Sequence, residues 1–73
     1  MNELSQLINQ TKKYLTQYDY DNVLKLCDKI LEKDSHSRFA MEFKAISLYH
    51  KKDYKGSLEL YEKLNRIYYN DDE

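Results

Sequence analysis

The chain contains no proline, one cysteine and one glycine in 73 residues. A single cysteine excludes an intrachain disulfide, and a single glycine excludes a glycine-rich phosphate-binding loop. No apolar run approaches the ~20 residues of a membrane span, and the first residues lack the basic start and apolar centre of a signal peptide. These absences predict a soluble protein of the cytoplasm with no membrane partner.

Neither sign of charge dominates the sequence. Twelve Lys and Arg residues stand against 13 Asp and Glu residues, giving a formal net charge of −1. The chain therefore lacks the basic field that draws nucleic acid or an anionic membrane. Lys51, Lys52 and Lys55 form a small basic corner, but the lysines alternate with acids, which favours a solvated surface over an RNA site. Nucleic acid is the least favoured of the partners considered.

The sequence repeats itself with a period of about 34 residues, a length typical of helical-hairpin repeats. The register is carried by pairs of matching residues, namely Asp19 and Asp53, Tyr20 and Tyr54, Leu24 and Leu58, and Leu26 and Leu60. We therefore divide the single domain, residues 1–73, into a first repeat at about 4–37, a second at about 38–71 and an acidic tail at 70–73.

Each repeat is expected to form two helices, because apolar residues recur at spacings of three and four. The expected helices cover about 4–18, 20–31, 37–51 and 54–69. Asp19 is predicted to cap the second helix, and Ser35 or Ser37 the third. Asp21 and Lys25 lie four apart with the acid first, an arrangement that favours an ion pair within one helix. The predicted fold is all-α, with two antiparallel helix–turn–helix repeats in a short α-solenoid.

This unit resembles the tetratricopeptide repeat. The resemblance rests on its length, on the small residues Thr11 and Ala45 midway along the first helix of each repeat, and on the repeated Asp-Tyr turn. It implies a protein–protein interaction module whose first helices line a concave, ligand-facing side. The expected partner-binding residues on that side are Ile8, Lys12, Phe39, Phe43, Ile46, Tyr49 and His50. Among them only Lys12 suits the carboxylate clamp of this family, so an apolar peptide or an amphipathic helix is the expected ligand.

The third helix leaves one alternative open. At about 100° per residue, Met41 and Ala45 lie on one side of the helix, and Phe39 and Phe43 lie nearly opposite. One apolar stripe packs within the hairpin. The phenylalanine stripe either lines a binding groove or forms core between the two repeats.

Self-association is the alternative function. A chain of 73 residues has a marginal core, and about three repeats are usually needed for a stable solenoid. We therefore expect a homo-oligomer that associates through Leu60, Ile67 and Tyr68 of the last helix or through the concave side. A fragment of a longer repeat array is the related possibility, and a small RNA-binding helical protein is the least favoured one.

Catalysis is not expected. Cys27 occupies a bulky core position, which predicts a buried, inert thiol. His36 and His50 are not placed by spacing to serve Cys27 as a base, and the three residues do not have the spacing of zinc ligands. The sequence predicts no enzyme, no metal and no cofactor.

Overall fold

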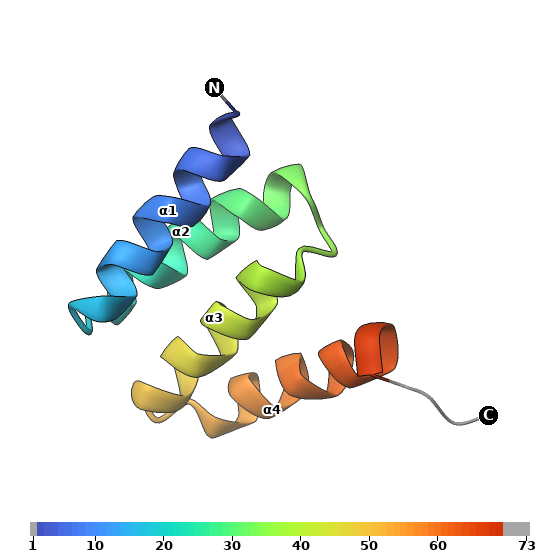
Figure 1. Ribbon diagram of the computed structural model, residues 1–73. Coiled ribbons are helices and arrows are strands. Elements are labelled where there is room, and N and C mark those ends of the chain that lie inside the picture. The colour runs from blue at the N-terminus through green and yellow to red at the C-terminus, as the bar shows by residue number, and fades with distance from the viewer. Residues whose placement is uncertain (1, 70–73) are drawn as a thin grey trace.

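A computed structural model describes residues 2–69 and contains no strand within that range. Its elements are α1 (Glu3–Thr16), α2 (Tyr20–Lys33), α3 (Arg38–His50), α4 (Tyr54–Leu64) and the π-helical turn η1 (Asn65–Tyr69). The all-α prediction is confirmed, with four helices in a repeat-like arrangement (Figure 1). The acidic tail predicted at 70–73 lies outside the described residues.

The helices pack in chain order. α1 packs on α2, α2 on α3 and α3 on α4, and α3 also touches α1. Figure 1 shows α4 on the side of α3 that faces away from α1. The result is a flat molecule that measures 38 × 31 × 18 Å. Its thin direction leaves much of every helix near the surface, as expected of a small solenoid.

Both hairpins use the same cap. The Asp19 side chain accepts a hydrogen bond from the Asn22 amide at the start of α2, and the Asp53 side chain accepts one from the Gly56 amide at the start of α4. Each carboxylate satisfies an amide that the first turn of a helix leaves without a partner. The predicted Asp19 cap is confirmed, and Ser37 caps α3 through the Ala40 amide.

α1 and α3 also end in the same way. Tyr18 and Lys52 occupy equivalent positions in the two repeats, and both have positive φ, at 60° and 70°. The Tyr18 amide bonds to the Leu15 carbonyl and the Asp19 amide to the Tyr14 carbonyl, and the second hairpin repeats both bonds. This pattern is the Schellman motif, which stops α1 at Thr16 rather than at the expected residue 18.

The last helix differs from its prediction as well. Helical periodicity predicts one element from 54 to 69, but α4 ends at Leu64 and the chain continues through the wider turn of η1. Apolar spacing cannot distinguish a continuous α-helix from one that ends in a π-helical turn, because a single π-helical turn shifts the following side chains by only one position.

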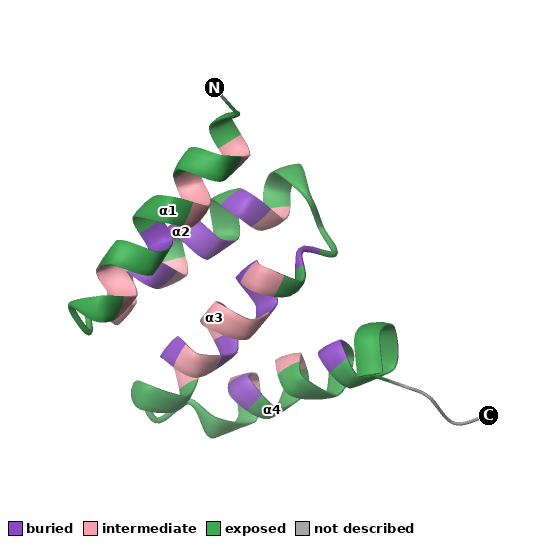
Figure 2. Ribbon diagram, viewed as in Figure 1, coloured by how far each residue is buried: buried purple, intermediate pink, exposed green. Residues whose placement is uncertain are grey.

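The core joins the two hairpins. Val23, Cys27 and Ile30 of α2 form one buried cluster with Ala40 of α3. Figure 2 shows the buried positions gathered mainly on α2 and α3, whereas most of α4 and η1 is exposed. α2 and α3 thus hold the main part of the core among the described residues.

Two buried serines have different surroundings. Ser57 Oγ donates a hydrogen bond of 2.9 Å to the Ala45 carbonyl and so ties α4 to α3. Ser47 Oγ is equally buried but has no hydrogen-bond partner among residues 2–69. A buried hydroxyl without a partner keeps its full desolvation cost.

These serines give a matched pair of substitutions. Ser47→Ala should raise the free energy of unfolding by about 1 kcal/mol, because it removes an unpaired hydroxyl. Ser57→Ala should lower it by about 1 kcal/mol, because it removes a bonded one. Urea denaturation of both variants tests the pair, and a stabilised Ser57→Ala with a destabilised Ser47→Ala would contradict it.

The positive φ of Lys52 gives a second test. Lys52→Gly should raise the free energy of unfolding by about 0.5–1 kcal/mol, because glycine adopts this left-handed conformation without steric cost. The control Lys25→Gly removes the same charge from an exposed site within α2, where glycine should destabilise by about 1 kcal/mol. Thermal melts of the two variants should therefore shift in opposite directions.

Candidate partner-binding surface

The exposed side of α1 and α3 brings four of the predicted binding residues together. The rings of Phe39 and Phe43 lie 4.1 Å apart between centroids, and both side chains are half-buried. Lys12 of α1 holds its ammonium nitrogen 5.8 Å from the centroid of the Phe39 ring, a cation–π contact. Ile8, also on α1, is half-buried beside the same core cluster. We call these four residues and Ile46 the α1/α3 face.

The phenylalanine pair is partly core and partly exposed, and its role in binding stays a prediction. Phe39 and Phe43 pack against the buried cluster of α2 and Ala40, so they contribute to the junction of the repeats. Each also keeps part of its surface in solvent. Ile46, one turn further along α3, is half-buried in the same way.

The remaining two predicted residues lie at the C-terminal end of α3. Tyr49 is 56% exposed. His50 stacks on Tyr20 of α2, with ring centroids 4.8 Å apart and planes 6° from parallel. The His50 ring is therefore directed at α2 and links the two hairpins, while Tyr49 presents an open aromatic surface.

The residues expected to associate are divided among different environments. Leu60 of α4 is half-buried, and Ile67 of η1 is exposed. Tyr68 is also exposed, but its hydroxyl donates to the His36 carbonyl in the linker before α3. The Tyr68 hydroxyl thus serves an intramolecular contact, and association through these three residues stays a prediction.

The neighbouring Tyr69 makes a second contact that sequence reasoning missed. Its hydroxyl lies 2.8 Å from Glu42 Oε2, and Arg38 Nε lies 3.2 Å from the same oxygen. The Arg38 guanidinium also stands over the Tyr69 ring, 5.0 Å from its centroid. The Tyr69 hydroxyl, followed by Arg38, holds the pKa of Glu42 below its usual value. The spacing of Arg38 and Glu42 could have indicated their pairing, but nothing in the sequence pointed to Tyr69.

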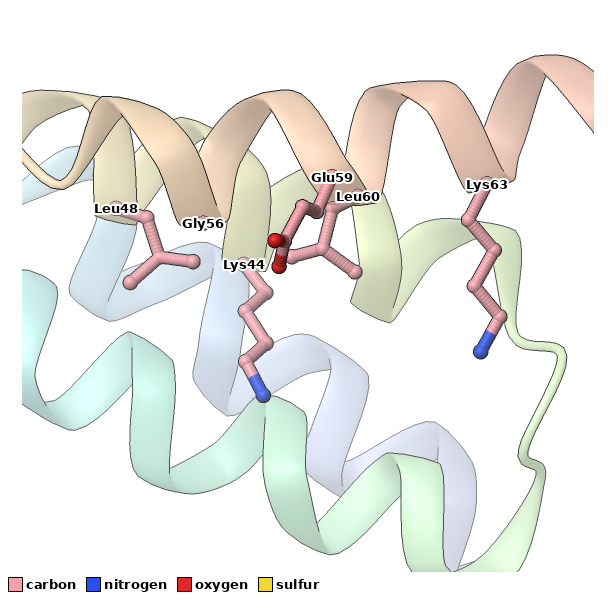
Figure 3. A pocket seen from close by; sticks show the side chains of 6 residues that line it. All are labelled: Lys44, Leu48, Gly56, Glu59, Leu60 and Lys63. Atoms are coloured by element: carbon pink, nitrogen blue, oxygen red, sulfur yellow. The ribbon is translucent and has the colours of Figure 1, made fainter.

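A shallow hollow lies on the other side of α3. It has a volume of about 330 Å³, and Figure 3 shows the six residues that line it, namely Lys44, Leu48, Gly56, Glu59, Leu60 and Lys63. The Lys44 ammonium group reaches toward α2, where it lies 2.8 Å from Asp28 Oδ1. Since charges of both signs line the hollow and Lys44 is already paired, its lining does not select an anion or a cation.

Cys27 is fully buried in the core, and its thiol is free. Burial raises the pKa of this thiol to about 12, and the nearby Asp28 carboxylate acts in the same direction. The thiolate form that nucleophilic chemistry needs is therefore disfavoured, and the prediction that Cys27 is buried is confirmed. Within residues 2–69, no group of three or more His, Cys, Asp or Glu side chains could hold a metal ion.

The burial of Cys27 predicts slow thiol chemistry. At pH 8 an aromatic disulfide reagent should label Cys27 at least about a thousandfold more slowly in the folded chain than in urea, because labelling requires opening of the core. The raised pKa also predicts an effect of pH on the free energy of unfolding. As the pH rises from 9 toward 12, the unfolded chain loses the thiol proton before the folded chain does, so the stability that this thiol contributes is lost. Cys27→Ala, which cannot ionise there, is the control. Labelling as fast as that of an unfolded peptide would contradict the buried site.

Comparison with known proteins identifies no relative. None of the family models, curated proteins or solved structures compared with the chain matches it. In the described part of the chain, no helix has the length and apolarity needed to cross a membrane.

Proposed function

We propose that this chain is a non-catalytic protein–protein interaction module, built like a pair of tetratricopeptide repeats. Its α1/α3 face would bind an apolar peptide or an amphipathic helix of another protein. The repeated hairpin, with the same cap and the same helix end at equivalent positions, supports the assignment to this architecture. We also place the module in the cytoplasm, as the sequence predicts.

The observation that carries the proposal is the half-buried pair Phe39 and Phe43. Packing against the core fixes both rings in position, so a ligand would meet a surface that is already ordered. Their solvent-facing sides offer apolar contact area, which is the main source of affinity in helix-in-groove recognition.

Lys12 supplies the polar part of the proposed site. Its ammonium group lies over the Phe39 ring and takes part in none of the ion pairs between described residues. An acidic side chain of the ligand would find a cation there, next to the aromatic surface. We therefore expect the preferred ligand to combine apolar residues at helical spacing with one carboxylate beside them.

Selection from a displayed peptide library tests this function. Sequences with apolar residues at spacings of three or four and a neighbouring Asp or Glu should be enriched on the immobilised chain. Lys12→Glu should weaken the binding of a selected peptide about tenfold or more, because it places like charges together. Lys13→Glu, the same change at an adjacent exposed residue outside the α1/α3 face, should leave affinity within about twofold.

Substitution of the phenylalanines is not a suitable test of binding. Phe43→Ser would remove core contacts as well as surface area, so lost binding could not be separated from lost stability. Amide shifts on titration with the selected peptide should map to α1 and α3. Equal binding by Lys12→Glu and Lys13→Glu, or shifts confined to α4, would contradict the proposed face.

A further inference from the structure

The internal repeat shows which surface of the molecule lacks a neighbour. On α2, Tyr20 stacks on His50 of α3, Cys27 is buried against Ala40, and Leu24 lies half-buried between these two positions. The second hairpin packs against this side of α2. The register of the repeat therefore defines an equivalent side of α4.

That equivalent side is open. The counterparts of Tyr20, Leu24 and Cys27 are Tyr54, Leu58 and Tyr61, which are 55%, 58% and 44% exposed. We call these three residues the open α4 face. They recur at spacings of four and three, so they form one continuous apolar stripe along α4. Tyr49 adjoins the stripe, with its ring edge-on to Tyr54 at a centroid distance of 5.3 Å.

The opposite end of the molecule is polar. The residues of α3 that cover α2 include Phe39, Ala40, Phe43 and His50. Their counterparts on α1, in the register of the repeat, are Ser5, Gln6, Asn9 and Thr16, and all four are exposed. α1 of a second copy therefore cannot replace α3 in covering an apolar stripe, so head-to-tail stacking of copies is not favoured.

We propose that two copies of the chain pair through their open α4 faces, about a two-fold axis near Leu58. An apolar stripe of this kind is complementary to itself, which is the requirement for a two-fold interface. With the two α4 helices antiparallel, Tyr54 of each copy lies beside Tyr61 of the other, and the two Leu58 side chains meet close to the axis.

The charges beside the stripe favour this arrangement. Lys55 and Glu62 are exposed and lie seven residues apart, two helical turns, on the same flank of the open α4 face. Neither takes part in an ion pair within residues 2–69. An antiparallel two-fold pairing places Lys55 of each copy opposite Glu62 of the other, so two equivalent ion pairs form across the interface.

This pairing is independent of the proposed peptide site. Its residues lie on α4, and Lys12 on α1 takes no part in it. A chain that fails to bind peptides can still pair in this way, and a monomeric variant can still bind peptides. Failure of the peptide-binding experiment therefore does not contradict the pairing, and failure of the pairing experiment does not contradict the peptide site.

The oligomeric state of the chain against concentration tests the interface. Sedimentation equilibrium of the wild-type chain should show a monomer–dimer equilibrium in the micromolar range. Leu58→Glu should raise the dimer dissociation constant at least about 100-fold, because it brings two carboxylates together at the axis. Gln6→Glu adds the same charge to the polar surface of α1 and should leave the dissociation constant unchanged.

A charge exchange tests the antiparallel register. Lys55→Glu alone and Glu62→Lys alone should each weaken the dimer about tenfold, since each turns both ion pairs into like-charge contacts. Mixing these two variants in equal amounts should restore dimers, because every facing pair in the mixed dimer is again of opposite sign. The double variant Lys55→Glu with Glu62→Lys should also dimerise like the wild type.

The outcomes that overturn the proposal are distinct. A chain that stays monomeric up to millimolar concentration excludes the pairing. A dimer that survives Leu58→Glu but dissociates with Ile67→Glu places the interface on η1 instead. Assembly that continues beyond the dimer indicates a head-to-tail contact. All substituted side chains are exposed, so circular dichroism should report the same helical content in each variant.

Discussion

The contact between α2 and α3 around Ala40 is the interaction on which the rest of the structure depends. Ala40 is fully buried against the cluster of Val23, Cys27 and Ile30. Because its side chain is a single methyl group, the α3 backbone can lie close to α2, and the rings of Phe39 and Phe43 come to rest on the rim of the core. The α1/α3 face exists because this junction holds those rings half in and half out of solvent. Surface and core share the same residues, as a chain this small requires.

The sequence predicted the local structure wherever a residue type has a local physical consequence. Asp19 and Asp53 cap helices because a short carboxylate reaches the amides of the first turn. Apolar spacing gave four helices, and the register of the repeat gave two equivalent hairpins. The left-handed conformation of Tyr18 and Lys52 was not predictable from residue type, because glycine is the usual residue there. The register of the repeat implies only that the turn after α1 and the turn after α3 have the same geometry.

Distances across the structure were not predictable in the same way. Helical periodicity fixes the direction of a side chain about its own axis but not its separation from a neighbouring helix. It placed Phe39 and Phe43 on one stripe and could not say how deeply they are buried. Asp21 and Lys25 have ideal spacing for an ion pair, yet Asp21 Oδ1 lies 2.6 Å from Lys51 Nζ, at the end of α3. This contact, led by the hydrogen bond from Lys51, lowers the pKa of Asp21. It joins residues 30 positions apart and depends on how the hairpins dock.

The same limit explains why periodicity did not single out the open α4 face. Leu60, Ile67 and Tyr68 belong to a wide apolar arc, and periodicity alone cannot say which part of that arc α3 covers. Leu60 lines the hollow of Figure 3, and the Tyr68 hydroxyl is directed at the His36 carbonyl. Comparing α4 with α2, residue by residue, singles out Tyr54, Leu58 and Tyr61 instead. The comparison needs the structure, because only the packing of α3 on α2 shows which side of each helix receives a neighbour.

The two proposed surfaces share no residue, since one lies on α1 and α3 and the other on α4. Phe39 and Lys12 mark one end of the α1/α3 face, and Tyr49 lies ten residues further along α3, about 15 Å away at the helical rise. Tyr49 is the residue at the boundary, since its ring contacts both His50 and Tyr54. A second copy that covers Tyr54 would also reach Tyr49 while leaving Phe39 and Lys12 exposed. In such a pair, each copy would keep its own peptide site, one on either side of the two-fold axis. A ligand with two binding segments would then gain affinity from the pairing itself, because its second segment binds at the effective concentration that the first one sets.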